Sequence, residues 1–177
     1  EDWNLKVDFE SYPTTNHTIK YGVNYIYHTL TPNTASASNG EVDFSTAFKP
    51  KYANEGAIYI LDDMKLGTKW AINTGLRLSL FQQVGPYTSK LTGEEFGRFD
   101  AAKTYGGFEP RFSLNYKAND NLSFKTGIAL TTQYLHLVSN SSSTLPADVW
   151  VPSTEIVKPQ RGVQYAVGVF KNLSNDM

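Results

Sequence analysis

The most constraining feature of this sequence is a two-residue alternation of apolar and polar side chains that recurs in run after run. Successive side chains of a β-strand point to opposite faces of a sheet, so each run predicts a strand with one apolar and one polar face. In the clearest run, Ile72 and Leu78 share one face, whereas Arg77 and Ser79 share the other. We predict seven such strands and no helix, with runs at residues 3–10, 19–28, 55–61, 70–80, 108–117, 122–134 and 163–169.

Details of these runs give further expectations. The run 55–61 is apolar on both faces, so its orientation stays ambiguous, and Tyr134 falls on the apolar face of its run. Pro110 cannot donate to a ladder of hydrogen bonds, which makes a local bulge plausible there. The segment that begins with Asp62 and Asp63 is read as a turn.

The connections between the runs alternate strictly between short and long. The first, third and fifth are short, whereas the others span roughly 31–54, 82–106 and 139–160 and are rich in Ser, Thr, Asn, Gly and Pro. In an antiparallel meander every second connection lies on the same rim, so one rim carries tight turns and the other carries long loops. Bacterial outer-membrane barrels are built in this way, whereas long unstructured loops are rare in compact domains.

Strand length and polarity agree with a membrane barrel. A strand of about 12 residues rises roughly 40 Å, and a tilt near 40° still spans an apolar band of about 25 Å. The polar faces mix a few charges with glycine and small residues, which favours a wall around a wet or plugged lumen. The predicted fold class is therefore all-β, an antiparallel up-and-down transmembrane β-barrel segment.

Seven strands are an odd number, and an open sheet in lipid would leave backbone groups unsatisfied at both edges. We therefore expect residues 1–177 to be part of one outer-membrane barrel domain, with further strands outside this chain.

Composition excludes several classes of function. With 16 basic and 17 acidic residues, the chain shows no electrostatic footprint for nucleic acid. It has no cysteine, which removes disulfides, thiolate metal sites and cysteine nucleophiles. No apolar run is long enough for a membrane-spanning helix, although barrel strands need none. The 11 tyrosines and 3 tryptophans suit a membrane interface or, equally, an ordinary all-β protein.

Several motifs in order resemble the TonB-dependent outer-membrane receptors of the Bacteroidetes type. The segment 107–116 resembles the Glu-Pro-Arg strand of that family, and Trp70 through Arg77 resembles its W-x-x-x-x-G-L-R strand. The segments 55–62, 133–137, 145–152 and 158–160 also match, so the resemblance covers roughly 21–173.

The resemblance implies a large barrel closed by a plug domain, in the outer membrane of a bacterial cell. It implies import of a nutrient such as a siderophore, a cofactor or a glycan fragment, driven by TonB through the plug. The partners it implies are outer-membrane lipid, the rest of the same barrel, a plug domain outside this chain, TonB through that plug, and a surface lipoprotein. No enzymatic activity and no resident cofactor are expected. The alternatives are a non-transport barrel, adhesin-like or secretion-accessory, and a soluble lectin-like protein.

Candidate site residues fall into two groups. Five polar residues are predicted to face the lumen, namely Arg77, Glu109, Arg111, Lys125 and Gln133. Glu109 and Arg111 share one face of a strand, and pairing with a neighbouring strand or the plug is favoured over a substrate site. Five aromatic residues in the long connections would either contact ligand or pack the loops together, namely Tyr87, Phe96, Phe99, Tyr105 and Trp150.

No catalytic or metal site is predicted. His17, His28 and His136 lack the spacing of metal ligands and are expected to be surface or rim residues. The assignment of faces also predicts that an arginine is far more harmful at Leu78, in the bilayer, than at Ser79.

Overall fold

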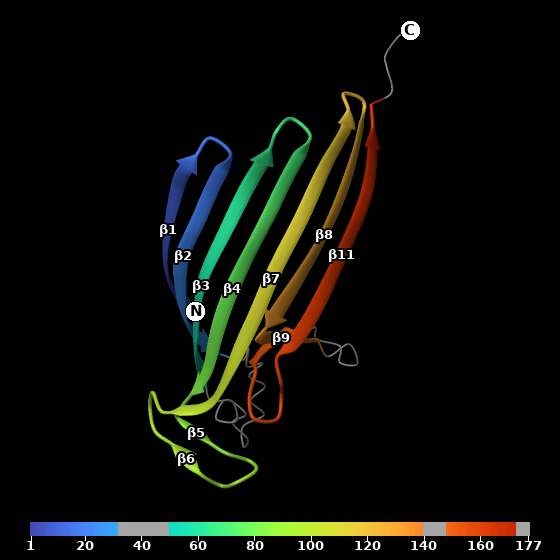
Figure 1. Cartoon of the computed structure of the whole chain (residues 1–177). Helices are drawn as coiled ribbons and strands as arrows, with labels where there is room; N and C mark the ends of the chain where they lie inside the picture. Colours follow the sequence, from blue (N-terminus) through green and yellow to red (C-terminus); the bar gives the residue numbers. More distant parts are fainter. Residues whose placement is uncertain (32–49, 140–147, 173–177) are drawn as a thin grey trace.

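The chain forms one sheet of seven long antiparallel strands that follow the order of the sequence, as the computed structural model shows (Figure 1). The structure describes residues 1–31, 50–139 and 148–172. The sheet consists of β1 (Asp2–Thr14), β2 (His17–Leu30), β3 (Lys51–Leu66), β4 (Trp70–Val84), β7 (Ala101–Asn119), β8 (Leu122–Gln133) and β11 (Gln160–Lys171). Two short hairpins lie outside it, β5 (Tyr87–Thr88) with β6 (Glu95–Phe96), and β9 (Leu135–Ser139) with β10 (Asp148–Pro152).

All seven predicted strands are present, and the described part of the chain contains no helix, so the predicted fold class is confirmed. Every strand except β8 is longer than its alternating run, with 16 residues in β3 and 19 in β7. Soluble strands usually have about five or six residues. No helix of the described residues is long and apolar enough to cross a membrane.

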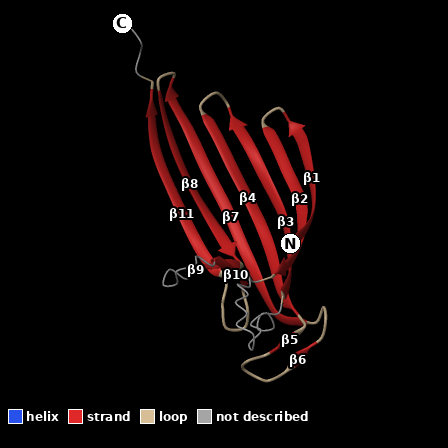
Figure 2. Ribbon diagram, turned by 180° about the vertical axis from the view of Figure 1, so that it is seen from behind, coloured by secondary structure: helices blue, strands red, loops and turns tan. Residues whose placement is uncertain are grey.

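The two rims differ as predicted. Tight turns join β1 to β2, β3 to β4 and β7 to β8 at one end, whereas the strand ends that the long connections join all lie at the other end (Figure 2). Because β3, β4 and β7 extend further than their alternating runs, the first two long connections are shorter than expected, at 31–50 and 85–100. The third, at 134–159, is longer than expected, because β8 ends at Gln133. The last two contain the short hairpins.

The interpretation of Asp62 and Asp63 as turn residues is wrong. Strand β3 continues through both, and the turn follows at Gly67, whose φ of 62° is a conformation that glycine adopts at no steric cost. Both aspartates have partners within the sheet. Asp62 binds His17 at 2.8 Å, and Asp63 accepts a hydrogen bond from the Asn73 side chain.

The bulge that Pro110 suggested is also absent. Pro110 pairs with Leu76 on β4 without a shift of register. The register between β7 and β8 begins one residue later, at Arg111 opposite Ala129. The proline thus lies where that ladder ends, a place that tolerates a residue without an N–H.

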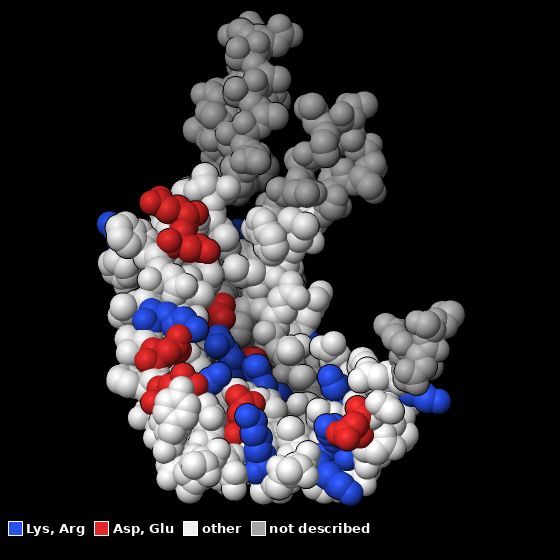
Figure 3. All heavy atoms as spheres, turned by 90° about the horizontal axis from the view of Figure 1, so that it is seen from above, with Lys and Arg blue, Asp and Glu red and all other residues white. Residues whose placement is uncertain are grey.

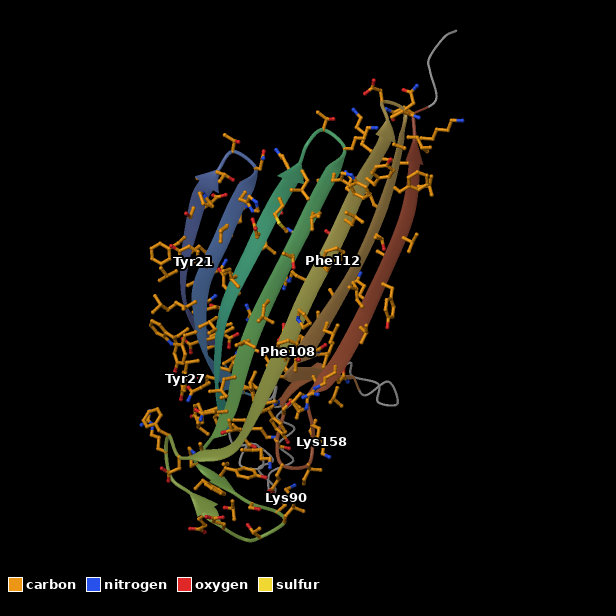
Figure 4. The ribbon with its side chains drawn as sticks, in the orientation of Figure 1. Tyr21, Tyr27, Lys90, Phe108, Phe112 and Lys158 are labelled. Carbon is orange, nitrogen blue, oxygen red and sulfur yellow. The ribbon has the colours of Figure 1, made fainter. Side chains whose placement is uncertain are left out.

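The sheet is curved, with its polar face inside and its apolar face outside. The space-filling view shows charged side chains gathered along the hollowed side (Figure 3). The register also orients the ambiguous run in β3, because Ile58 and Ile60 lie on the exposed outer face and Ala57 is buried on the inner face. The outer face exposes large apolar side chains from every long strand, among them Leu5, Leu78, Ile128 and Val167. Tyr21, Phe108 and Phe112 belong to the same face and are labelled in Figure 4.

No second sheet and no helix covers this apolar face within the described residues. A soluble protein would bury such a surface, because large contiguous apolar patches are rare on soluble monomers. Among the described strands, β1 and β11 each pair with a single neighbour, so the sheet is an open arc rather than a closed ring.

A small buried cluster lies on the inner side, near the rim with long connections. Phe81 stacks on Tyr134 with ring centroids 4.9 Å apart, and Ala53, Tyr105 and Leu135 complete the cluster. The hairpin of β9 and β10 folds over this side, and β10 lies against β2. The prediction that Tyr134 faces outward is therefore wrong, because the chain leaves the sheet after Gln133 and turns inward.

Candidate functional site

A chain of ionic contacts crosses the inner face from β1 to β7. His28 binds Asp2 at 3.0 Å and lies 3.5 Å from Glu55. Arg77 lies 3.9 Å from Glu55 and 3.8 Å from Glu109. Three carboxylates, from Asp2, Glu55 and Glu109, thus alternate with the His28 imidazole and the Arg77 guanidinium across five neighbouring strands. Each carboxylate that is partly removed from water keeps a cationic or polar partner, as burial of charge requires.

The chain ends in a buried hydroxyl pair beside Glu109. Ser79 Oγ donates to Glu109 Oε1 at 2.7 Å, because a carboxylate only accepts. The Ser79 proton is thereby used, so Tyr134 Oη donates to Ser79 Oγ at 2.9 Å. Gly107 makes room for this arrangement. A Cβ at that position would contact Ser79 Oγ and lie 2.7 Å from Tyr134 Oη.

This geometry corrects the expectation for Ser79. The residue does lie on the inner face, but it is buried and bonded on both sides, so it is not an open wall position that tolerates an arginine.

The five polar residues predicted to face the lumen all belong to this inner face. Arg77 and Glu109 pair with each other, which agrees with the structural role favoured for Glu109. Arg111 lines an open cavity of about 490 Å³ together with Arg77. The Lys125 ammonium lies 4.5 Å from the centre of the Phe170 ring, and Gln133 donates to the Leu135 carbonyl at 2.6 Å. Contact of any of them with plug or substrate stays a prediction.

Two of the three histidines are not surface residues. His28 is buried within the ionic chain. His136 is buried as well and lies 3.1 Å from Ser153 Oγ. Since Ser153 donates to the Tyr134 carbonyl, His136 Nε2 carries the proton in this contact. His17 is half-buried and bound to Asp62. Within the described residues, no group of His, Cys, Asp and Glu could hold a metal ion.

The predicted loop aromatics divide into packed and exposed residues. Tyr87 and Phe96 face each other across the β5–β6 hairpin, with ring centroids 6.4 Å apart. Tyr105 lies in β7, not in a connection, and packs against the buried cluster. Phe99 and Trp150 are exposed, so these two remain the best candidates for contact with a ligand.

Glu155 joins two long connections and was not singled out from the sequence. Its carboxylate accepts hydrogen bonds from Tyr87 Oη and Ser89 Oγ, both at 2.7 Å, and from the Lys90 N–H at 2.8 Å. These donors favour the charged form, and they hold the pKa of Glu155 below its ordinary value. Nothing in the local sequence of this glutamate distinguishes it from any other polar loop residue.

An open arc of long strands, with an apolar outer face, a charged inner face and all long connections on one rim, defines part of the wall of a transmembrane β-barrel. The model of one protein family, described as TonB dependent receptor-like, beta-barrel, matches residues 1–174. The chain belongs to this family. Searches of curated proteins and of solved structures found no match.

Membership establishes the setting of the molecule. Barrels of this family lie in the bacterial outer membrane, and the family consists of transporters, not enzymes. The resemblance inferred from the motifs is confirmed at the level of the TonB-dependent receptor barrel.

Proposed function

We propose that this chain is part of the barrel wall of a receptor that imports a scarce nutrient, with a plug domain inside the barrel and TonB acting through that plug. The proposal depends on one observation, the character of the inner face of this sheet, which belongs to a TonB-dependent receptor barrel. That face is charged, largely paired and hollowed, whereas the outer face is apolar. Residues 1–177 then form part of one barrel domain, whose other strands pair with the open edges of β1 and β11.

The finer assignments follow from the motifs and from charge. The order of motifs in β3, β4, β7 and the segment 133–160 supports a receptor of the Bacteroidetes type. The inner face offers Arg111 and Lys125 to an acidic surface of the plug. Phe99 and Trp150, on the rim with long connections, are the proposed ligand contacts, and a surface lipoprotein would bind at the same rim.

A siderophore, a cofactor and a glycan fragment are the substrate classes that the proposal admits. The test compares cells with and without the full-length receptor on a ferric siderophore, on cyanocobalamin and on an oligosaccharide as limiting nutrient. We expect the cells without the receptor to fail on one of the three, and removal of TonB to cause the same failure. Equal growth on all three, with no effect of TonB, would contradict import and favour the non-transport barrel.

Within the transporting receptor, Phe99→Ala tests the proposed contact at the rim. We expect a higher concentration of nutrient for half-maximal uptake and an unchanged amount of receptor in the outer membrane. Leu91 is exposed in the same connection, so Leu91→Ala is the matched control. Identical uptake by the Phe99 variant and the wild type would remove Phe99 from the site.

A further inference from the structure

The Glu155 carboxylate fastens together two connections that lie far apart in the sequence. Both of its oxygens are used, Oε1 by Tyr87 and Lys90, and Oε2 by Ser89. Hydrogen bonds to an ionised acceptor are shorter and stronger than those between neutral groups. The three bonds come from one short stretch of the β5–β6 connection, so a single side chain holds that connection in place.

The donors are held in place by contacts within the hairpin that do not involve Glu155. Ser89 is buried, and its Oγ accepts the backbone N–H groups of Leu91 at 3.2 Å and Thr92 at 3.0 Å. With its acceptor sites occupied by the backbone, the Ser89 hydroxyl points its proton at the carboxylate. Tyr87 is held by its cross-strand contact with Phe96. The hairpin therefore presents a preformed socket for one carboxylate.

The other side of the contact is equally rigid. Glu155 lies in a tight turn, in which the Thr154 N–H donates to the Val157 carbonyl at 2.8 Å. Thr154 Oγ1 accepts from the N–H groups of Ile156 and Val157, at 3.3 Å and 3.1 Å. The turn thus fixes the direction of the Glu155 side chain.

This turn is bound to the barrel wall. Tyr105 Oη on β7 donates to the Thr154 carbonyl at 2.6 Å. The buried Ser153 donates both its N–H and its hydroxyl to the Tyr134 carbonyl, at 2.7 Å and 2.9 Å. Tyr134 in turn stacks on Phe81 of β4. The turn 153–157 is therefore fixed to the barrel wall by hydrogen bonds to Tyr105 and Tyr134.

By contrast, the β5–β6 hairpin has a narrow base on the wall. The Gly85 N–H donates to the Asp100 carbonyl at 3.0 Å, and Gly85 forms an isolated bridge with Arg98. A hairpin attached only at its base can swing about that base. Glu155 removes this freedom by joining the hairpin, beyond its base, to the turn that the wall holds.

We propose that Glu155 is a positioning residue that locks the β5–β6 hairpin onto the wall-anchored turn 153–157, so that the two connections move as one body at the mouth of the barrel. This inference rests on the proposed import function only in one respect, namely that joint movement of the two connections would serve import. The lock itself is a property of the protein without substrate.

The experiment measures the distance between the two connections in the full-length receptor, in lipid nanodiscs and without substrate. Spin labels are placed at Lys90→Cys and Lys158→Cys, because both lysines are exposed on the two facing segments (Figure 4). With Glu155 present, double electron–electron resonance should give one narrow distribution of distances. With Glu155→Ala, we expect the distribution to become at least about twice as broad, because the hairpin then loses the three hydrogen bonds that join it to the turn 153–157.

Two further variants separate a lock from a general disturbance. Glu155→Gln keeps one carbonyl acceptor, so it should broaden the distribution less than Glu155→Ala. Tyr87→Phe should broaden it when Glu155 is present and add nothing to Glu155→Ala, because contacting residues in one network are not additive. Glu94→Ala removes an exposed carboxylate from the same hairpin and should leave the distribution narrow.

An unchanged narrow distribution in Glu155→Ala would overturn the proposal, and so would equal broadening by Glu94→Ala. Neither result would bear on import, which the growth experiment tests separately. Resistance of the folded barrel to detergent at room temperature shows in each case that the variant has folded.

Discussion

The exposed outer face gives a quantitative prediction at Leu78. This residue lies at the middle of β4, pairs with Ile58 and Phe108 on its neighbours, and is 42% exposed. An arginine on the lipid face at the bilayer midplane costs about 2–4 kcal/mol. Because about 1.4 kcal/mol corresponds to a factor of ten, Leu78→Arg should lower the folding equilibrium constant by roughly 30- to 1,000-fold.

The control places the same charge on the inner face. Gln164 pairs with Ala129, and Ala129 pairs with Arg111, so Gln164 lies on the face that already carries that arginine. Gln164 is exposed, and Gln164→Arg should change the stability by less than about 1 kcal/mol. Guanidinium titration of the full-length receptor in lipid vesicles measures both variants. Equal losses of stability at positions 78 and 164 would refute the assignment of the two faces.

Two other predictions concern the inner wall and the rim. Gly107→Ala should destabilise the receptor by about 1–3 kcal/mol, because its methyl group overpacks the hydroxyl pair. A methyl group at Gly106 would meet no atom closer than 4.0 Å beyond its chain neighbours, so Gly106→Ala should cost much less. Thermal unfolding compares the two variants, and equal costs would contradict the close packing around Gly107. Hydrogen bonds from Tyr87 and Ser89 lower the pKa of Glu155, so its ionised form stabilises the locked state. This contribution is fully present at any pH above the ordinary glutamate value of 4.5. It is lost as the pH falls through the lowered pKa. The distance distribution between labels at Lys90 and Lys158 should therefore stay narrow from pH 7 to pH 5 and broaden only at more acidic pH, and broadening already at pH 6 would be inconsistent with this sign.

The strands, and the faces of most of them, could be predicted from the sequence because alternation is a local property; the run 55–61, apolar on both faces, is the exception. The alternation in a run such as 70–80 indicates which side chains share a face, and no knowledge of the neighbouring strands is needed. The sorting of the rims was predictable for the same reason, since the connections are read along the chain. The exact ends were not, because β3 carries Asp62 and Asp63 at its membrane-rim end, where polar residues are as acceptable as in a turn.

The contacts of the inner face could not be predicted, because they depend on register between distant segments. Ser79 and Tyr134 are 55 positions apart, and their hydrogen bond forms only because the chain turns inward after β8. His28 has the same explanation, since Asp2 and Glu55 reach it from two different strands. Glu155 lies in a turn, and its role could not be predicted because one of its hydrogen-bond donors, Ser89, lies in a hairpin 66 positions earlier in the sequence.

The fold of the β9–β10 hairpin across the hollow side has a mechanical consequence. Strand number and stagger set the radius of a complete ring of strands. Here β10 reaches from the far flank of the arc to β2, as a chord joins two points of a circle. A chord keeps an arc from straightening, so this stretch of wall holds its own bend.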